Sequence, residues 1–260
     1  MSCSSNATMA DHDSFDEAAP PPSCSRRAPL LEEVPLLVTV LAGNVVTAAV
    51  MAACLNAADA TVLRRLHPAI AVVIAGVPWA DTTTPVWDLT RWRAALPAAV
   101  GCILSRGIGV ADVARLPPTL RLLDVSYCQR LTPDVSFAHL LALETLNCRD
   151  AAVVAAGFAR LPPSLRKLRI INCVLPKTAN FNYLRALQVL ECNMLSAIAM
   201  TSLPPSLEIL MIGCSSGRMS MWPPGGSLAH LTRLRVLRVA RTCIDAAAVG
   251  TFPPSLHSLH

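Results

Sequence analysis

The chain has 260 residues, of which 53% are apolar and only 4% aromatic, so leucine, valine and alanine must supply its core. This composition excludes a wholly disordered chain and favours a stack of small similar layers. The net charge of +5 comes from residues 116–260, which carry 14 basic and 7 acidic residues. Because this mild excess contains no Lys/Arg run, nucleic acid is not expected as a partner.

The first 29 residues are acidic and proline-containing, with almost no large apolar side chain. This composition predicts that residues 1–29 form a disordered tail. The first basic residue is Arg26, so the positively charged start of an ordinary secretory signal peptide is missing.

Residues 30–95 are predicted to form a helical N-terminal unit. Its uncharged run from Val34 to Ala58 is long enough for a transmembrane helix. Pro35 and Gly43 interrupt the run, and its large apolar residues recur at helical spacing, so a buried pair of helices is the favoured interpretation. The alternative is a helix that spans a membrane.

Two further helices are expected in this unit. The first starts near Asp59, places Leu63 and Leu66 on one face, and is interrupted by Pro68. A turn at residues 81–85 then leads to the second helix, from Trp87 to Leu96. In that helix Trp92 should face inward, and the residues expected to face outward are Arg91 and Arg93.

A repeated motif organises residues 116–260. The segment LPPSLRKLRIINC at residues 161–173 returns in similar form from Leu116, Leu203 and Phe252, and three copies without the proline pair alternate with these. The leucine that opens each L-x-x-L pair marks a repeat, and these markers are Leu120, Leu143, Leu165, Leu187, Leu207, Leu234 and Leu256. Their separation of 20 to 27 residues predicts a solenoid whose repeats pack on their neighbours.

The pattern L-x-x-L-x-L/V/I-x-x-C of these copies resembles the leucine-rich repeat family. The resemblance implies an α/β solenoid over residues 96–260, with parallel strands on a concave face and short helices or turns on a convex face. Residues 96–104 are interpreted as a degraded first repeat with Val100 as its marker. No polar repeat follows Leu256 and Leu259, so we expect either a shortened form of a longer repeat protein or an end covered by another copy or a partner.

The segments that return from one strand to the next are rich in alanine and valine, as in residues 150–160 and 245–250. They predict short helices or turns, for which Asp134 and Asp245 are candidate caps. One longer step indicates an insertion at residues 213–226, whose apolar residues are expected to be exposed in a loop, namely Met219, Met221 and Trp222.

A second resemblance concerns the helical unit. Leu55, Asp59, Leu63 and Leu66, followed by Trp79, loosely resemble the second half of an F-box. The usual opening of that family is only hinted at by residues 31–35. The resemblance implies docking to a ubiquitin ligase adaptor. The alternative is that these helices cap the first repeat and cover its apolar edge.

Ten cysteines are present, and several recur with the repeat. Cys128 and Cys173 occupy the position that closes the strand motif, whereas Cys148 and Cys192 replace its third apolar residue. They are therefore expected to be buried, reduced thiols in a reducing compartment. No C-x-x-C pair and no His/Cys cluster at metal-ligand spacing occurs, so neither a metal nor another cofactor is expected.

No catalytic motif is found, and His139 and His230 each open a repeat at the same offset, which favours a structural role. The sequence therefore predicts a non-enzymatic, cytoplasmic scaffold that binds a protein partner and that could serve as a substrate-recognition adaptor of a ubiquitin ligase. The alternative is a membrane-anchored recognition protein. The residues expected to face the partner from the concave face are Asp124, Asn147, Arg169, Glu191, Met211 and Arg238.

Overall fold

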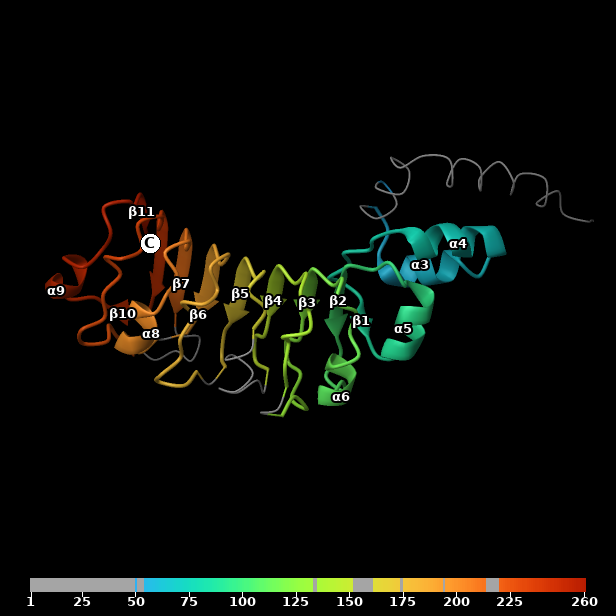
Figure 1. Ribbon diagram of the computed structural model, residues 1–260, viewed down its shortest axis with the longest axis horizontal. Coiled ribbons are helices and arrows are strands. Elements are labelled where there is room, and N and C mark those ends of the chain that lie inside the picture. Colours follow the sequence, from blue (N-terminus) through green and yellow to red (C-terminus); the bar gives the residue numbers. More distant parts are fainter. Residues whose placement is uncertain are drawn as a thin grey trace, which may run out of the picture.

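The computed structural model describes residues 50, 54–132, 135–151, 161–173, 175–193, 195–213 and 220–260, and within them nine parallel strands form one open sheet. The strands follow one another in chain order along the long axis of the molecule (Figure 1). They are β1 (Pro85–Val86), β2 (Gly101–Leu104), β3 (Leu122–Asp124), β4 (Thr145–Asn147), β5 (Lys167–Ile170), β6 (Val189–Cys192), β7 (Ile209–Gly213), β9 (Val236–Ala240) and β11 (Ser258–Leu259). The chain therefore has the solenoid-like α/β architecture expected from its repeats.

Each repeat buries the same apolar positions. The markers from Leu120 to Leu234 are fully buried, as is the second leucine of each L-x-x-L pair, which pairs in register with its neighbours from Leu123 to Leu237. The marker amide also donates to the carbonyl three residues earlier, as from Leu165 to Pro162 at 3.2 Å. The spacing of leucines along the sequence thus becomes a set of stacked layers with one continuous core.

The first repeat starts one residue earlier than predicted. Gly101 pairs with Leu122, which makes Ala99, and not Val100, the equivalent of the marker Leu120. Ala99 is buried and its amide donates to Leu96 at 3.1 Å, as the later markers do. The prediction was wrong because the larger side chain was taken as the marker, whereas the hydrogen-bonded turn sets the register.

Short helices occupy the side of the sheet that returns the chain: α6 (Val110–Val113), α8 (Ala197–Thr201) and α9 (Ala246–Val249). Figure 1 shows α6 and α8 below the row of strands. The expected cap at Asp245 is confirmed, since its carboxylate accepts from the Ala248 amide at 2.7 Å. Asp134 and most of residues 150–160 lie outside the described residues.

A left-handed residue follows the strand in several repeats. Positive φ angles occur at Tyr127, Asp150, Asn172 and Arg241. Each lies five residues after the first residue of its strand, and these first residues pair in register with neighbouring strands: Leu122, Thr145, Lys167 and Val236. Asp and Asn tolerate this conformation better than Tyr or Arg, and Asn172 also donates to Asp150 in the preceding repeat at 2.7 Å.

The helical unit contains α3 (Ala57–Leu63), α4 (Pro68–Gly76) and α5 (Leu89–Ala95). Asn56 caps α3 in a capping box with Asp59, and His67 caps α4 directly before Pro68. Trp92 lies inward as expected, packed against the cores of both the unit and the sheet. Leu66, however, is 67% exposed, because α3 ends before it reaches that position.

The insertion differs from the prediction at Trp222, which is buried and not exposed. Its indole N–H donates to the Gly226 carbonyl at 3.1 Å, and its ring meets Phe252 edge to face at 5.6 Å. The residue beside it, Met221, is 69% exposed and belongs to β8 (Ser220–Met221), which pairs with β10 (Thr242–Cys243). Met219 lies outside the described residues.

The tail at residues 1–29 and nearly all of the run from Val34 to Ala58 also lie outside the described residues. Among the helices that are described, none has both the length and the apolar character needed to cross a membrane. Whether the run enters a membrane stays a prediction, which carbonate extraction of membranes would test.

Candidate functional site

The six predicted partner-facing residues lie in one row across the sheet. Asp124 pairs in register with Asn147, and the row continues through Arg169, Glu191, Met211 and Arg238. Each is flanked along the chain by buried residues, except that Arg238 is followed by the half-buried Val239, and each therefore points to the side opposite the core. We call this side the outer face of the sheet.

The part of the row on β3 and β4 is internally satisfied. The Asn147 amide donates to the Asp124 carboxylate at 2.8 Å, while the other carboxylate oxygen accepts from the Ser126 amide at 2.7 Å. The Asn147 side-chain oxygen in turn accepts from the Arg149 amide at 3.2 Å. The first of these bonds connects neighbouring repeats, and together the three bonds leave few free donors for a ligand.

Glu191 is the one carboxylate among the described residues that is buried. Arg169 donates to it through Nε at 2.5 Å, and the Lys167 ammonium lies 3.7 Å from its second oxygen. Two cations therefore compensate one buried charge, which would otherwise be costly in this apolar setting. This ion cluster joins β5 to β6 and uses the charges of all three side chains.

The part of the outer face on β7 and β9 is different. Met211 and its neighbours Ile209 and Val236 are half-buried apolar side chains, and Arg238 is exposed. No ion pair or hydrogen bond of the Arg238 side chain to another described residue is found. A small cavity of about 230 Å³ opens between Met211, Arg238 and Ala240. This part of the sheet therefore combines apolar surface with an unpaired cation.

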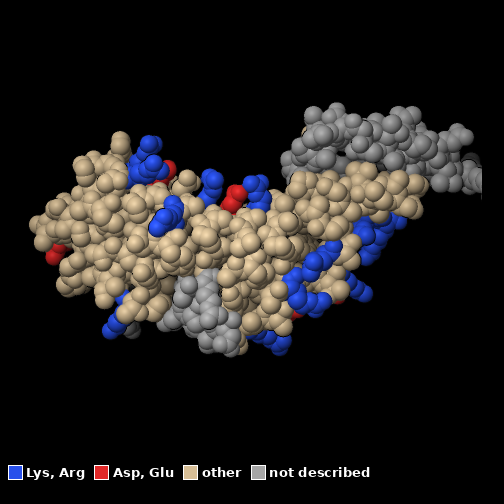
Figure 2. Space-filling model, viewed as in Figure 1, with Lys and Arg blue, Asp and Glu red and all other residues tan. Residues whose placement is uncertain are grey.

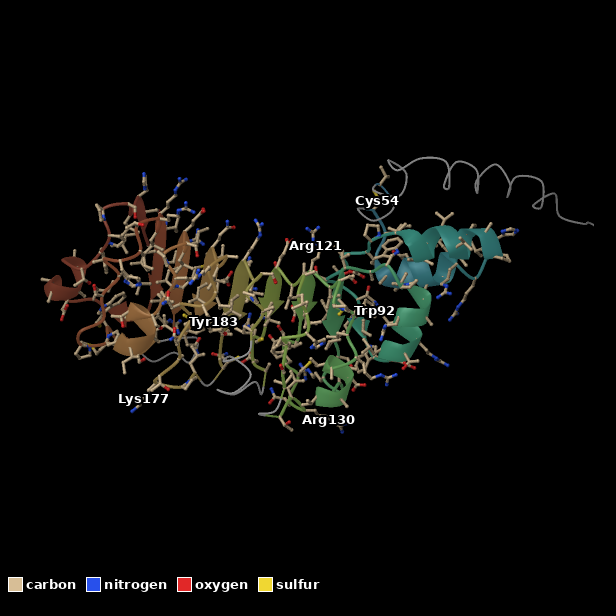
Figure 3. The ribbon with its side chains drawn as sticks, viewed as in Figure 1. Cys54, Trp92, Arg121, Arg130, Lys177 and Tyr183 are labelled. Carbon is tan, nitrogen blue, oxygen red and sulfur yellow. The ribbon has the colours of Figure 1, made fainter. Side chains whose placement is uncertain are left out.

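A larger cavity of about 710 Å³ lies in the helical unit, between α3, α5 and the turn before α5. Its lining includes Trp87 and Trp92, with Arg64, Arg65 and Arg91 around them. Trp87 is 75% exposed, so a large aromatic surface faces solvent. Basic side chains gather over this part of the molecule in Figure 2, and Figure 3 shows Trp92 where the unit meets the sheet.

The recurrent cysteines are free thiols, as predicted. Cys128, Cys148 and Cys192 are buried, but Cys173 is only half-buried. The Cys173 thiol donates to the Cys148 carbonyl of the preceding repeat at 2.7 Å, and Cys128 donates likewise to Ser105 at 3.4 Å. The closing cysteines thus act as hydrogen-bond donors between layers.

Burial keeps these thiols protonated at neutral pH. It raises the pKa of Cys128 and of Cys173 from the ordinary value of 9.0 to about 11, with nearby carboxylates adding to the effect. For Cys102 burial and the charge of Asp124 raise the pKa to about 12. A protonated, poorly accessible thiol is a weak nucleophile, so these positions favour structural roles.

The histidines that begin repeats differ in their surroundings, since the buried Nε2 of His139 has no hydrogen-bond partner among the described residues. His230 contacts the Leu203 carbonyl through Nε2 at 3.0 Å, and the equivalent Tyr183 hydroxyl accepts from the Leu161 amide at 3.4 Å. Both contacts join a copy without the proline pair to the proline-containing copy before it. In the described part of the chain, no group of three or more His, Cys, Asp or Glu residues could hold a metal ion.

The cavity in the helical unit and the small cavity beside Arg238 were not predicted from the sequence. The first requires knowledge of how α3 and α5 pack, which the helical spacing does not give. The second has a local signal, because Gly213 and Ala240 are the small residues at an outward position. A comparison with known protein families finds no match for this chain, and no similar sequence is found among curated proteins.

Proposed function

We propose that this chain is a non-enzymatic protein-recognition scaffold of the leucine-rich repeat type, which binds a protein partner on the outer face of its sheet. The observation that carries the proposal is the single row from Asp124 to Arg238, which places six side chains of five residue types on the outer face of a rigid parallel sheet. Such a surface can match one partner over several repeats, because each strand contributes one adjustable residue.

The pattern of buried residues in the repeats supports the proposal that they are of the leucine-rich repeat type. Leucines fill the inward positions, and the closing cysteines donate to carbonyls of the preceding repeat, as at Cys173. The core therefore uses the positions that the motif fixes, and the outward positions are left free to vary. A scaffold with variable outward positions is suited to recognition.

Affinity capture with the full chain tests this proposal. The double variant Thr145→Lys/Met211→Lys adds two long cations to the outer face. The control variant, Ala111→Lys/Thr178→Lys, adds two lysines on the other side of the sheet, where α6 lies and where Lys177 points away from the strands (Figure 3). Partners quantified by mass spectrometry should be lost with the first variant and retained with the second. Equal capture by both variants would contradict recognition at the outer face.

The helical unit favours a second role, as the docking module of a ubiquitin ligase adaptor. The supporting observation is the open cavity with Trp87 exposed at its edge, on a unit whose Trp79 is buried as in a closed helical module. Trp87→Glu should remove a ligase adaptor from the co-purified partners. Val72→Glu is the matched control, since Val72 is 74% exposed on α4 and does not line the cavity. Absence of any ligase adaptor with the unchanged chain would refute this role.

A further inference from the structure

The cavity beside Arg238, which we call the slot, results from two small residues. Gly213 and Ala240 pair in register on β7 and β9, at the outward position that Arg149 and Ile171 occupy in earlier repeats. Larger side chains there would cover the strand ends. A Cβ atom on Gly213 would lie 3.1 Å from that of Ala240, so a side chain at this position would crowd Ala240, and glycine leaves the space beside it free of a side chain.

The size of the slot limits what it can hold. Its volume of about 230 Å³ lies below the range of roughly 300–1,000 Å³ typical of sites for whole small molecules. Its walls are mainly apolar and include Met211, Ile212 and Ile171. The slot therefore suits one aliphatic side chain of a larger ligand.

The charge at the rim specifies the neighbouring group. Arg238 forms no ion pair with another described residue, and the nearest carboxylate in its row, Glu191, is already paired with Arg169 and Lys167. An exposed guanidinium beside an apolar slot favours a carboxylate, with which it can form two parallel hydrogen bonds.

We propose that the slot binds a protein segment that inserts one Leu, Ile or Met side chain and places an Asp or Glu carboxylate on Arg238. This inference rests on the proposed function, because it names the chemistry of the partner at the same outer face. Met211 forms one wall, so its flexible side chain adapts to the shape of the inserted group. The rest of the partner would extend along the row toward β6.

A randomised peptide library displayed against the full chain tests the slot. Peptides with an aliphatic residue one or two positions from an acidic residue should be enriched. Ala240→Leu fills the slot from an exposed position and should weaken binding of the selected peptides about 10- to 100-fold, the effect of losing one buried aliphatic side chain. Arg238→Glu should redirect selection toward Lys and Arg, whereas the exposed Arg233→Glu should change nothing.

The Met211 methyl resonance provides a direct readout, since it should shift when a selected peptide is added to the unchanged protein. No enrichment, or enrichment that Ala240→Leu and Arg238→Glu leave unchanged, overturns the slot. Loss of captured partners in Thr145→Lys/Met211→Lys but not in these two variants would refute the slot alone. If none of the variants affects capture, the proposed function fails as well.

Discussion

The helical unit and the repeat sheet use different means to hold their residues. In the sheet, an interior strand such as β6 pairs on both sides and repeats the contacts of its neighbours. The helical unit joins the sheet through one short strand and a few individual contacts: β1 pairs with β2, the Trp79 carbonyl accepts from amides at the start of β2, and Trp92 packs against both cores. A mutation in the helical unit should therefore destabilise that unit alone, whereas a mutation inside the sheet should also destabilise the neighbouring layers.

Trp79 connects the two regions. Its side chain is 1% exposed and donates to the Ile74 carbonyl at 2.9 Å, while its own carbonyl accepts from the amides of Val100 and Gly101 at 2.8 and 2.9 Å. The same double acceptance recurs between repeats, where the Arg121 carbonyl accepts from the amides of Glu144 and Thr145. The helical unit thus ends in the backbone geometry of a repeat.

The largest effect is expected for Trp79→Ala, which should cost roughly 3–5 kcal/mol within the helical unit. Hydrogen exchange should show that amides of α3 and α4 lose protection while those of β5 to β7 keep it. Trp79→Phe is the control, because it retains most of the packing and loses only the indole hydrogen bond. Equal loss of protection in the sheet would mean that the two regions unfold as one.

Leu190→Ala tests the sheet and should cost roughly 2–5 kcal/mol, because Leu190 is fully buried between two layers. Its neighbours in register are Leu168 and Leu210. We expect protection to fall in β5, β6 and β7 together, measured by the same exchange experiment. A loss confined to β6 would contradict layer-to-layer coupling.

The cysteines distinguish two kinds of position inside the sheet. Cys192→Ser should cost about 1–3 kcal/mol, since it places a hydroxyl among apolar neighbours where the thiol forms no hydrogen bond to another described residue. Cys173→Ser should cost less, because a hydroxyl can donate to the same Cys148 carbonyl. Denaturant unfolding of both variants measures the difference, and the reverse order would be inconsistent with these roles.

The sequence was sufficient to predict which residues of the sheet face the core, but not how the helical unit packs, and the difference has a physical reason. The same inward positions recur in seven copies of the motif. It was therefore possible to align Leu165 with its equivalents, and to predict the row through Arg169, without a structure. The marker Ala99 was missed because that copy is degraded. Trp222 was predicted to be exposed because its partner Phe252 lies in a different repeat.

In the helical unit no copy exists against which to check an assignment. The amphipathic pattern suggested Leu66 as part of a buried face, yet α3 ends at Leu63. Contacts such as that between Asp81 and the start of α3 join residues far apart in the sequence and leave no periodic signal. The candidate row was therefore predictable, whereas the cavity around Trp87 was not.

The smallest expected effect concerns Asp81, which accepts from the Ala57 amide at 2.6 Å and from Thr83 at 2.7 Å. Burial by itself would raise the pKa of Asp81, but the hydrogen bonds from Ala57, Thr83 and Thr84 outweigh it and lower the pKa below its usual 3.8. The charged form therefore stabilises the folded unit. This contribution is complete above the unfolded pKa and is lost as the pH falls through the folded one.

Asp81→Asn should consequently destabilise the helical unit at neutral pH by roughly 0.3–1 kcal/mol, the value of a carboxylate at a helix N-terminus. In the unchanged protein, protection of α3 relative to β5 should fall as the pH is lowered below about 4, whereas in the variant this relative decrease should vanish. Exchange measured by NMR at several pH values, with the Trp79 indole proton as a second probe, provides the test. If α3 and β5 lose protection in parallel in both proteins, the Asp81 carboxylate does not stabilise the start of α3.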